Sequence, residues 1–163
     1  MKSLHGITRQ AFLGFFTSHI VFTLIIDGQA IFPKFFFPVI LQDLLQFYIS
    51  NFNDPLMKHT PLWFQSLIVL EFCIQLPFFF VACWYLSSAK CSRYPSWFRM
   101  VCITYGAHVV TSMIPILSCL ITNSDATFNE RCRVLGAYLP YLIFPLWIWY
   151  IAITDDVEKI KQI

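Results

Sequence analysis

The amino-acid sequence predicts an all-α membrane protein: a bundle of four transmembrane helices with kinks, and a short amphipathic helix between the first two spans. Of the 163 residues, 58% are hydrophobic and only 12% are charged, whereas a soluble globular domain carries about 25% charged residues. Four separate stretches are apolar over the roughly 20 residues that an α-helix needs to cross a bilayer. The connections are too short for a further domain, so we expect residues 1–163 to form a single four-helix domain.

The first predicted span covers residues 11–32. Because Lys2 and Arg9 precede this apolar run, a cleaved signal peptide is the alternative interpretation. However, His19 and Asp27 interrupt the run, and no small-x-small cleavage site follows it closely. These features favour a retained transmembrane helix.

Residues 35–53, between the first two spans, mix apolar and polar side chains mostly at helical spacing. Ile40 and Phe47 are examples of the apolar positions, and Asp43 and Gln46 of the polar ones. This pattern indicates one short amphipathic helix, which lies at the membrane interface or caps the bundle.

The other predicted spans cover residues 62–86, 97–121 and 134–153. All three contain proline: Pro77, Pro115, Pro140 and Pro145. Each proline removes a backbone hydrogen bond and bends its helix. Kinks on three of four helices can open a cavity between them, although proline is also frequent in transmembrane helices as a packing feature. Both interpretations stay open at this point.

The distribution of basic residues predicts that both termini are cytosolic. The side of the membrane that holds the termini carries Lys2, Arg9, Lys90, Arg93, Arg99, Lys159 and Lys161. The other side carries Lys34, Lys58, Arg131 and Arg133. The more basic side is normally cytosolic. Lys159 and Lys161 also fit a cytosolic dilysine retrieval pattern, with a solubilising tail as the alternative.

The six cysteines match neither a disulfide framework nor a zinc site. Four lie within predicted spans, and Cys91 and Cys132 fall on opposite sides of the membrane. We interpret them as small buried apolar residues. The sequence also contains no phosphate loop, dinucleotide fingerprint or metal-ligand cluster. We therefore expect no cofactor, no bound metal and no nucleic-acid partner.

Two carboxylates lie within apolar stretches, Asp27 in LIIDGQAIF and Glu71 in SLIVLEFCIQLPFFF. An ionisable side chain near the bilayer centre costs about 2.5–3.5 kcal/mol and usually serves function. On a helix, His19 and Thr23 would share a face with Asp27, and Gln75 would share one with Glu71. For the three neutral residues, hydrogen bonding between helices is the favoured interpretation. The two acids are the candidate functional site.

Two carboxyl groups close together in a dry cavity cannot both ionise at low cost, so we expect the pair to share a proton. Because aspartic acid is the stronger acid in model compounds, we assign the charge to Asp27 and the proton to Glu71, although such a pair titrates as a unit. A protonated amine would pair with the carboxylate while apolar walls bury its body. A neutral sterol could hydrogen-bond its hydroxyl to the same acids.

Four segments carry a family resemblance: SHIVFTLIIDGQAIFP, NFNDPLMKHTPLWFQSLIVLEFCIQLPFF, HVVTSMIPIL and AYLPYLIFP. In order and through nearly the whole chain, they resemble the sigma-2-receptor branch of the emopamil-binding-protein-like (EXPERA) superfamily. The loop at residues 123–133 looks shorter than in the mammalian receptors, and the tail is less basic. These departures concern partner contacts more than the pocket.

The resemblance implies a four-helix protein of the endoplasmic reticulum membrane, with lysosomal and nuclear-envelope membranes as further locations. Its occluded cavity would open toward the lipid and bind sterols and cationic amphiphilic amines in cholesterol homeostasis. A homodimer and a lysosomal cholesterol transporter of the Niemann-Pick type are the implied protein partners. The implied ligand-binding residues are Asp27, Glu71, Gln75, Tyr105, Ser112 and Tyr141. His19 and Asp54 are the implied supporting residues, and the Asn-Asp-Pro turn chemistry of Asp54 agrees with a structural role.

Two other functions compete with a receptor. The same superfamily contains a sterol double-bond (Δ8–Δ7) isomerase, and a carboxyl beside a carboxylate, with His19 or His108 as a second proton group, suits that chemistry. The matching strings belong to the receptor branch, however, and the chain is short for the isomerase. A channel or transporter is disfavoured because only one compact ionisable cluster and no internal repeat is visible.

Overall fold

The computed structural model describes residues 4, 6–88 and 95–160, with side chains to residue 154. Within this part of the chain all regular structure is helical, and four segments are long and apolar enough to cross a membrane: Gly6–Ala30, Leu62–Ser87, Ser96–Ile121 and Phe128–Thr154. The predicted fold class, an all-α protein with four transmembrane helices, is confirmed. The dilysine pattern at Lys159 and Lys161, the basic residues Lys2, Lys90 and Arg93, and Cys91 lie outside the residues or side chains described.

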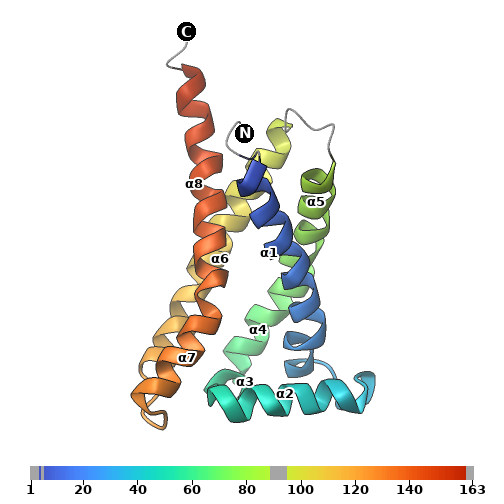
Figure 1. Cartoon of the computed structure of the whole chain (residues 1–163), viewed down its shortest axis with the longest axis vertical. Coiled ribbons are helices and arrows are strands. Elements are labelled where there is room, and N and C mark those ends of the chain that lie inside the picture. Colours follow the sequence, from blue (N-terminus) through green and yellow to red (C-terminus); the bar gives the residue numbers. More distant parts are fainter. Residues whose placement is uncertain (1–3, 5, 89–94, 161–163) are drawn as a thin grey trace.

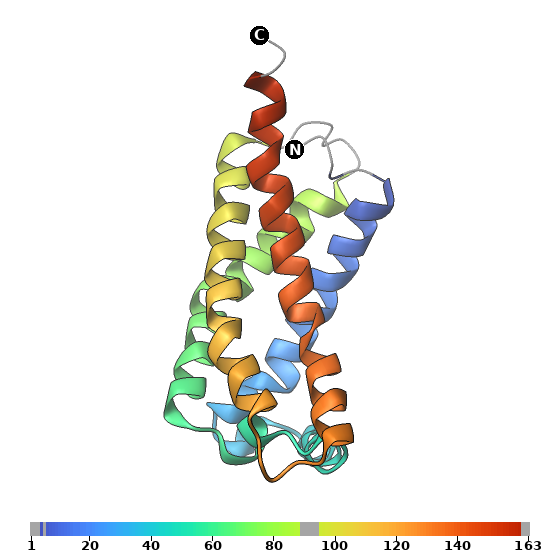
Figure 2. The same ribbon diagram turned by 90° about the vertical axis from the view of Figure 1, so that its left-hand side faces the viewer.

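The helices form two closely packed pairs (Figure 1). Helix α1 (Gly6–Ile25) packs along α5 (Leu76–Ser87), and α6 (Ser96–Ile121) packs along α8 (Pro140–Ile160). Both termini lie at one end of the bundle, and α2 (Val39–Phe52) lies across the opposite end, as the perpendicular view in Figure 2 also shows. The four spans therefore run between the end that holds the termini and the end crossed by α2.

The first span is not one uninterrupted helix. It begins at Gly6 rather than at the predicted residue 11, and α1 ends at Ile25, before a 3₁₀ turn at Asp27–Ala30. The Gln29 amide in this turn donates to the backbone carbonyls of Ile25 (2.7 Å) and Leu41 (2.9 Å). This side chain therefore ties the end of the first span to α2 and fixes the turn that carries Asp27.

The second and fourth spans are interrupted near Pro77 and Pro140, whereas α6 and α8 continue as α-helices through Pro115 and Pro145. In the second span, α4 (Leu62–Leu70) continues into a π-helical turn, Glu71–Gln75, directly before α5. Pro77 has no N–H to donate to the preceding turn, and a π-helical turn of this kind is frequent at functional sites. In the fourth span, α7 (Phe128–Tyr138) and α8 are separated at Leu139, before Pro140.

Helix α2 is the predicted amphipathic helix, and α3 (Pro55–His59) follows it at the same end of the bundle. Leu45 is buried against the bundle, whereas Ile40 and Phe47 are 75% and 65% exposed. Asp54 caps α3 by accepting hydrogen bonds from the backbone N–H groups of Leu56 (2.8 Å) and Met57 (3.3 Å). An aspartate cap followed by proline is a strong signal for a helix start.

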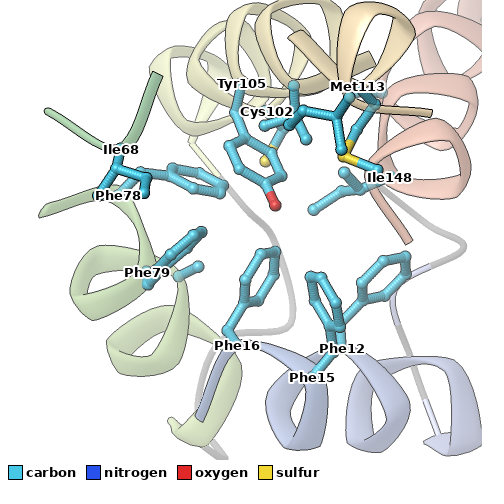
Figure 3. Packing of buried hydrophobic residues seen from close by; sticks show 14 of the residues in the cluster. Phe12, Phe15, Phe16, Ile68, Phe78, Phe79, Cys102, Tyr105, Met113 and Ile148 are labelled. Atoms are coloured by element: carbon cyan, nitrogen blue, oxygen red, sulfur yellow. The ribbon is translucent and has the colours of Figure 1, made fainter. Parts of the chain in front are cut away.

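Aromatic side chains fill the half of the bundle between α1, α5 and α6 (Figure 3). Phe16 packs edge-on against Phe78, with ring centroids 5.4 Å apart, and Tyr105 stacks on Phe78 at 4.3 Å. Phe12, Phe16 and Phe79 are fully buried. Such ring pairs contribute about 0.5–1.5 kcal/mol each beyond simple burial. This rigid core holds α1 and α5 in register and so positions the residues near their ends.

Candidate functional site

A cavity of about 520 Å³ lies between the rigid aromatic core and α2. Its volume is typical of sites for drug-sized ligands, which span about 300–1,000 Å³. Side chains from all four spans and from α2 line it. The lining includes six of the residues predicted from the sequence: His19, Asp27, Glu71, Gln75, Ser112 and Tyr141.

Glu71 is held by two side chains of α1. The Thr23 hydroxyl donates a hydrogen bond of 2.5 Å to Oε1 of Glu71, and Nε2 of His19 lies 3.2 Å from the same oxygen. Thr23 is fully buried and His19 is nearly so. The polar faces of the first and second spans thus meet as the sequence spacing predicted, with Glu71 as the shared acceptor.

The imidazole of His19 is fixed by aromatic rings as well as by Glu71. It stacks on Phe79, with ring centroids 4.4 Å apart, and meets Tyr141 at 4.6 Å in a tilted arrangement. Its Nδ1 atom is buried and has no hydrogen-bond partner. Within the described chain, Nε2 of His19 therefore faces a polar partner, Glu71, and Nδ1 does not.

Asp27 differs from Glu71 in its surroundings. It lies in the 3₁₀ turn just beyond α1, is partly buried and lines the cavity. Within the described chain its carboxylate accepts no hydrogen bond. Neither carboxylate oxygen is fully buried. Both oxygens therefore remain accessible from the cavity. The same holds for Oε2 of Glu71.

The other predicted residues are distributed between the cavity and the core. Gln75 is buried in the cavity wall, and its amide makes no hydrogen bond within the described chain. The Ser112 hydroxyl donates to the backbone carbonyl of Val109 at 2.9 Å. Tyr105 does not line the cavity; its ring belongs to the aromatic core, and Figure 3 shows its hydroxyl pointing inward among the Phe side chains. That hydroxyl is buried without a partner.

Asp54 forms a buried hydrogen-bond network that joins three elements. Besides capping α3, it accepts hydrogen bonds from the hydroxyls of Tyr48 in α2 (2.9 Å) and Tyr138 in α7 (2.8 Å). Burial and the neighbouring Asp54 carboxylate raise the pKa of Tyr48 above its ordinary value, so that Tyr48 remains a hydroxyl donor. Asp54 is fully buried, and its arrangement agrees with the structural role implied for it.

Tyr48 and Tyr138 also line the cavity, although no sequence pattern marked them as site residues. Tyr138 lies 84 positions from its partner Asp54, a distance that no local pattern reveals, whereas Tyr48 lies only 6 positions from Asp54. The sequence held only an indirect signal for these two tyrosines. A buried tyrosine needs a hydrogen-bond partner for its hydroxyl, and Asp54, the acid predicted to be structural, could serve as that partner. The two rings form the wall of the cavity next to α2.

Most of the cavity lining is apolar, and part of it faces outward. Three lining residues are largely exposed: Phe22 of α1 (50%), and Leu44 (46%) and Phe47 (65%) of α2. We refer to this outward-facing part of the lining, contributed by α1 and α2, as the mouth. None of the three carries a polar side-chain group, so the mouth suits entry of an apolar or amphiphilic molecule from the side of the bundle.

The described side chains contain no group of three or more His, Cys, Asp or Glu residues that could hold a metal ion. Among them the free cysteines are Cys73, Cys83, Cys102, Cys119 and Cys132. Cys102 is buried, whereas Cys73 and Cys132 are exposed, which corrects the expectation that the cysteines are uniformly buried. For Cys73 the exposed surface belongs to a membrane-spanning helix, where exposure to lipid is favourable.

The fold and the cavity together define a class: a small multi-pass membrane protein with an apolar cavity that presents carboxyl groups within its transmembrane helices. The family model for EXPERA (EXPanded EBP superfamily) matches residues 40–152. The chain belongs to this family.

Individual relatives agree with this assignment. The chain is 35% identical over 159 residues to the human protein named Sigma intracellular receptor 2, covering 91% of this chain and 88% of the human one. It is 36% identical to the protein of the same name from Xenopus tropicalis, covering 83% and 81%. It is 27% identical to Efficient mitochondria targeting-associated protein 19 of Saccharomyces cerevisiae, covering 88% and 96%. The resemblance to the sigma-2-receptor branch, seen in the motifs, is confirmed.

Proposed function

We propose that this protein is a sigma-2-receptor-like intracellular membrane receptor, which binds cationic amphiphilic amines and sterols, including oxysterols, in the cavity. The observation that carries the proposal is Asp27, an acid in an apolar intramembrane cavity whose carboxylate has no hydrogen-bond partner within the described chain. A buried carboxylate without a partner is costly. An ammonium group supplied by a ligand would relieve that cost and gain a strong ion pair in a medium of low dielectric.

The same cavity suits a sterol. Its walls are formed by aliphatic and aromatic side chains, and its polar groups gather around Asp27, Glu71 and Gln75. A sterol has one hydroxyl on a rigid apolar body, so it could bury its rings against the walls while the hydroxyl bonds to Gln75 or to an acid. Ser112 and Tyr141 lie in the lining as further contacts, and Tyr105 would act from the core behind it.

The cellular part of the proposal rests on the human and macaque relatives, whose name describes an intracellular receptor. We place the protein in the endoplasmic reticulum membrane with both termini in the cytosol, acting in cholesterol homeostasis and trafficking. Arg9 and Arg99, near the starts of α1 and α6, lie toward the end of the bundle that holds the termini and support this orientation. A homodimer and a lysosomal cholesterol transporter of the Niemann-Pick type are the proposed protein partners.

A sterol isomerase remains the second candidate, and one observation favours it. The contact between His19 and Glu71 in the cavity joins two groups that exchange protons readily, next to a third group, Asp27, with free oxygens. Protonating one carbon of an alkene and removing a proton from another needs such paired groups. A carbocation-like amine would bind to either kind of protein, so only product formation separates them.

The deciding experiment pairs two assays on purified protein in nanodiscs. One measures saturable binding of a radiolabelled cationic amphiphile, and the other follows conversion of a Δ8 sterol by mass spectrometry. Asp27→Asn should lower amine affinity at least about 30-fold, because losing one partner of a buried charge pair costs about 2 kcal/mol or more. Asp43→Asn is the matched control, since Asp43 lies on the exposed face of α2.

The results separate the candidates. Binding that is lost in Asp27→Asn and kept in Asp43→Asn, without sterol turnover, supports the receptor. Turnover that depends on Asp27 or Glu71 would replace it with an isomerase. Equal amine affinity in the wild-type and Asp27→Asn proteins would contradict the ion-pair model.

A further inference from the structure

We propose that Asp27, rather than Glu71, holds the shared proton in the empty cavity, and that Asp27 gives this proton to an amine that enters uncharged from the lipid. The inference rests on the proposed amine-binding function and specifies its proton chemistry. It reverses the assignment made from the acidities of the free side chains, because the structure distributes hydrogen-bond donors unequally between the two acids.

The hydrogen-bond donors around Glu71 favour its anionic form. Thr23 donates to Oε1 at 2.5 Å, and Nε2 of His19 lies 3.2 Å from the same atom. Hydrogen bonds to a carboxylate stabilise its charged form relative to the neutral acid. Thr23 and His19 are therefore positioning residues: they act on the ligand through Glu71.

Asp27 has the opposite environment. It accepts no hydrogen bond within the described chain, although it lies within electrostatic reach of both Glu71 and Asp54. Asp54 accepts four hydrogen bonds. Because Glu71 and Asp54 have donors and Asp27 has none, Asp27 is the favoured site for a proton. The remaining titratable groups in the cavity lining are His19 of α1, Tyr48 of α2, Tyr138 of α7 and Tyr141 of α8.

The mouth of the cavity determines the form in which an amine arrives. Phe22, Leu44 and Phe47 are exposed there and carry no charge or hydrogen-bonding side-chain group. A charged amine would lose its hydration at this mouth without compensation. The uncharged amine, having left its proton in the water, can pass this mouth. Inside, the O–H bond of Asp27 breaks as an N–H bond forms on the amine, which leaves an ammonium and a carboxylate in contact.

This step predicts net proton release. An alkylpiperidine with an aromatic tail is protonated in neutral water, and it is protonated again in the complex. The free protein carries the Asp27 proton and the complex does not, so about one proton per bound amine passes to the buffer. If Asp27 were already ionised and Glu71 kept its proton throughout, binding would release none.

Isothermal titration calorimetry in nanodiscs measures this number directly. The alkylpiperidine is titrated at one neutral pH in two buffers with different ionisation enthalpies, and the difference between the observed enthalpies gives the protons released. The wild-type protein should release about one proton. Glu71→Gln and Thr23→Val should still bind but release clearly less, because each weakens or removes the anion that keeps the proton on Asp27.

Thr17→Val is the matched control. Thr17 lies on the same helix, and its hydroxyl contacts the sulfur of Cys83 outside the cavity. This variant should release as many protons as the wild type. If Thr23 had only a structural role, Thr23→Val would change the affinity for the amine but not the number of protons released per bound amine.

The outcomes are distinct. Amine binding by the wild type with no proton release would overturn this inference and leave the proposed function intact. No amine binding by the folded wild-type protein would overturn both. Release of about one proton that persists in Glu71→Gln would also contradict the inference, because Glu71 would then have no part in holding the proton on Asp27.

Discussion

At the scale of single residues, Asp54 shows how an acid can be structural inside a membrane protein. All four of its hydrogen bonds come from protein donors, two from backbone N–H groups and two from tyrosine hydroxyls. Because hydrogen bonds to a charged group contribute about 1.5–3 kcal/mol each, this fully buried carboxylate stabilises the fold. Asp27 has no such partners, which separates a structural acid from a candidate ligand-binding acid.

We expect Asp54→Asn to lower the free energy of unfolding by about 4 kcal/mol, because the amide oxygen can satisfy only two of the four donors and the other two stay unpaired. Tyr138→Phe removes a single donor and should cost about 2 kcal/mol. Equilibrium unfolding in mixed detergent micelles measures both values.

Tyr150→Phe is the control for these variants, since Tyr150 is 67% exposed on α8. It should change the free energy of unfolding by less than about 0.5 kcal/mol. If Asp54→Asn proved as mild as Tyr150→Phe, the network would not stabilise the fold.

The sequence revealed the two intramembrane acids but not how the hydrogen-bond donors are divided between them. An acid in an apolar run is conspicuous, so Asp27 and Glu71 could be selected by type alone. Which one receives donors depends on where α1 ends, and this is set by tertiary packing. The regular spacing of His19, Thr23 and Asp27 suggested one shared helical face, but α1 ends before Asp27 and leaves it in a turn.

At the scale of elements, the contact between α6 and α8 depends on a single glycine. A Cβ atom added at Gly106 would lie 2.5 Å from Cβ of Trp149 and 3.0 Å from the carbonyl oxygen of Pro145. One neighbour is a Cβ atom and the other is a backbone oxygen, so neither can move without shifting α8. Small residues at such crossings allow transmembrane helices to approach closely.

Gly106→Ala should therefore destabilise the protein by about 2 kcal/mol, the usual size of an overpacking effect. Gly136→Ala is the control, because no atom lies within 4 Å of an added Cβ there. That substitution should be neutral or stabilising by up to about 1 kcal/mol through helix propensity. Thermal unfolding in detergent compares the two, and equal effects would show that the α6–α8 contact tolerates a methyl group.

The predicted spans agree best with the structure where composition changes sharply. The second and third spans begin and end within one residue of the predicted 62–86 and 97–121. The fourth begins at Phe128 rather than at 134, because Thr127 and Glu130 form a reciprocal capping box that extends the helix through polar residues. Hydrophobicity alone does not detect this start, although the Thr-x-x-Glu pattern is visible in the sequence.

At the scale of the whole molecule, four spans place both termini at the same end of the bundle (Figure 1). We expect reporter tags at the N- and C-termini to be equally accessible to protease in sealed microsomes, on the cytosolic side. A tag inserted at residues 123–126, between α6 and α7, should be protected until detergent is added. Opposite accessibility of the two terminal tags would contradict an even number of spans.

The outward mouth at Phe22, Leu44 and Phe47 affects how affinity must be measured. A ligand that enters from the side of the bundle equilibrates with the protein through its mole fraction among the lipids. Its partition coefficient then multiplies its affinity for the cavity, so two amines with equal contacts to Asp27 would differ in aqueous Kd by the ratio of their partition coefficients. Changing the amount of detergent or lipid in an assay dilutes the ligand within that phase and shifts the apparent Kd, expressed in total ligand concentration, without altering any contact.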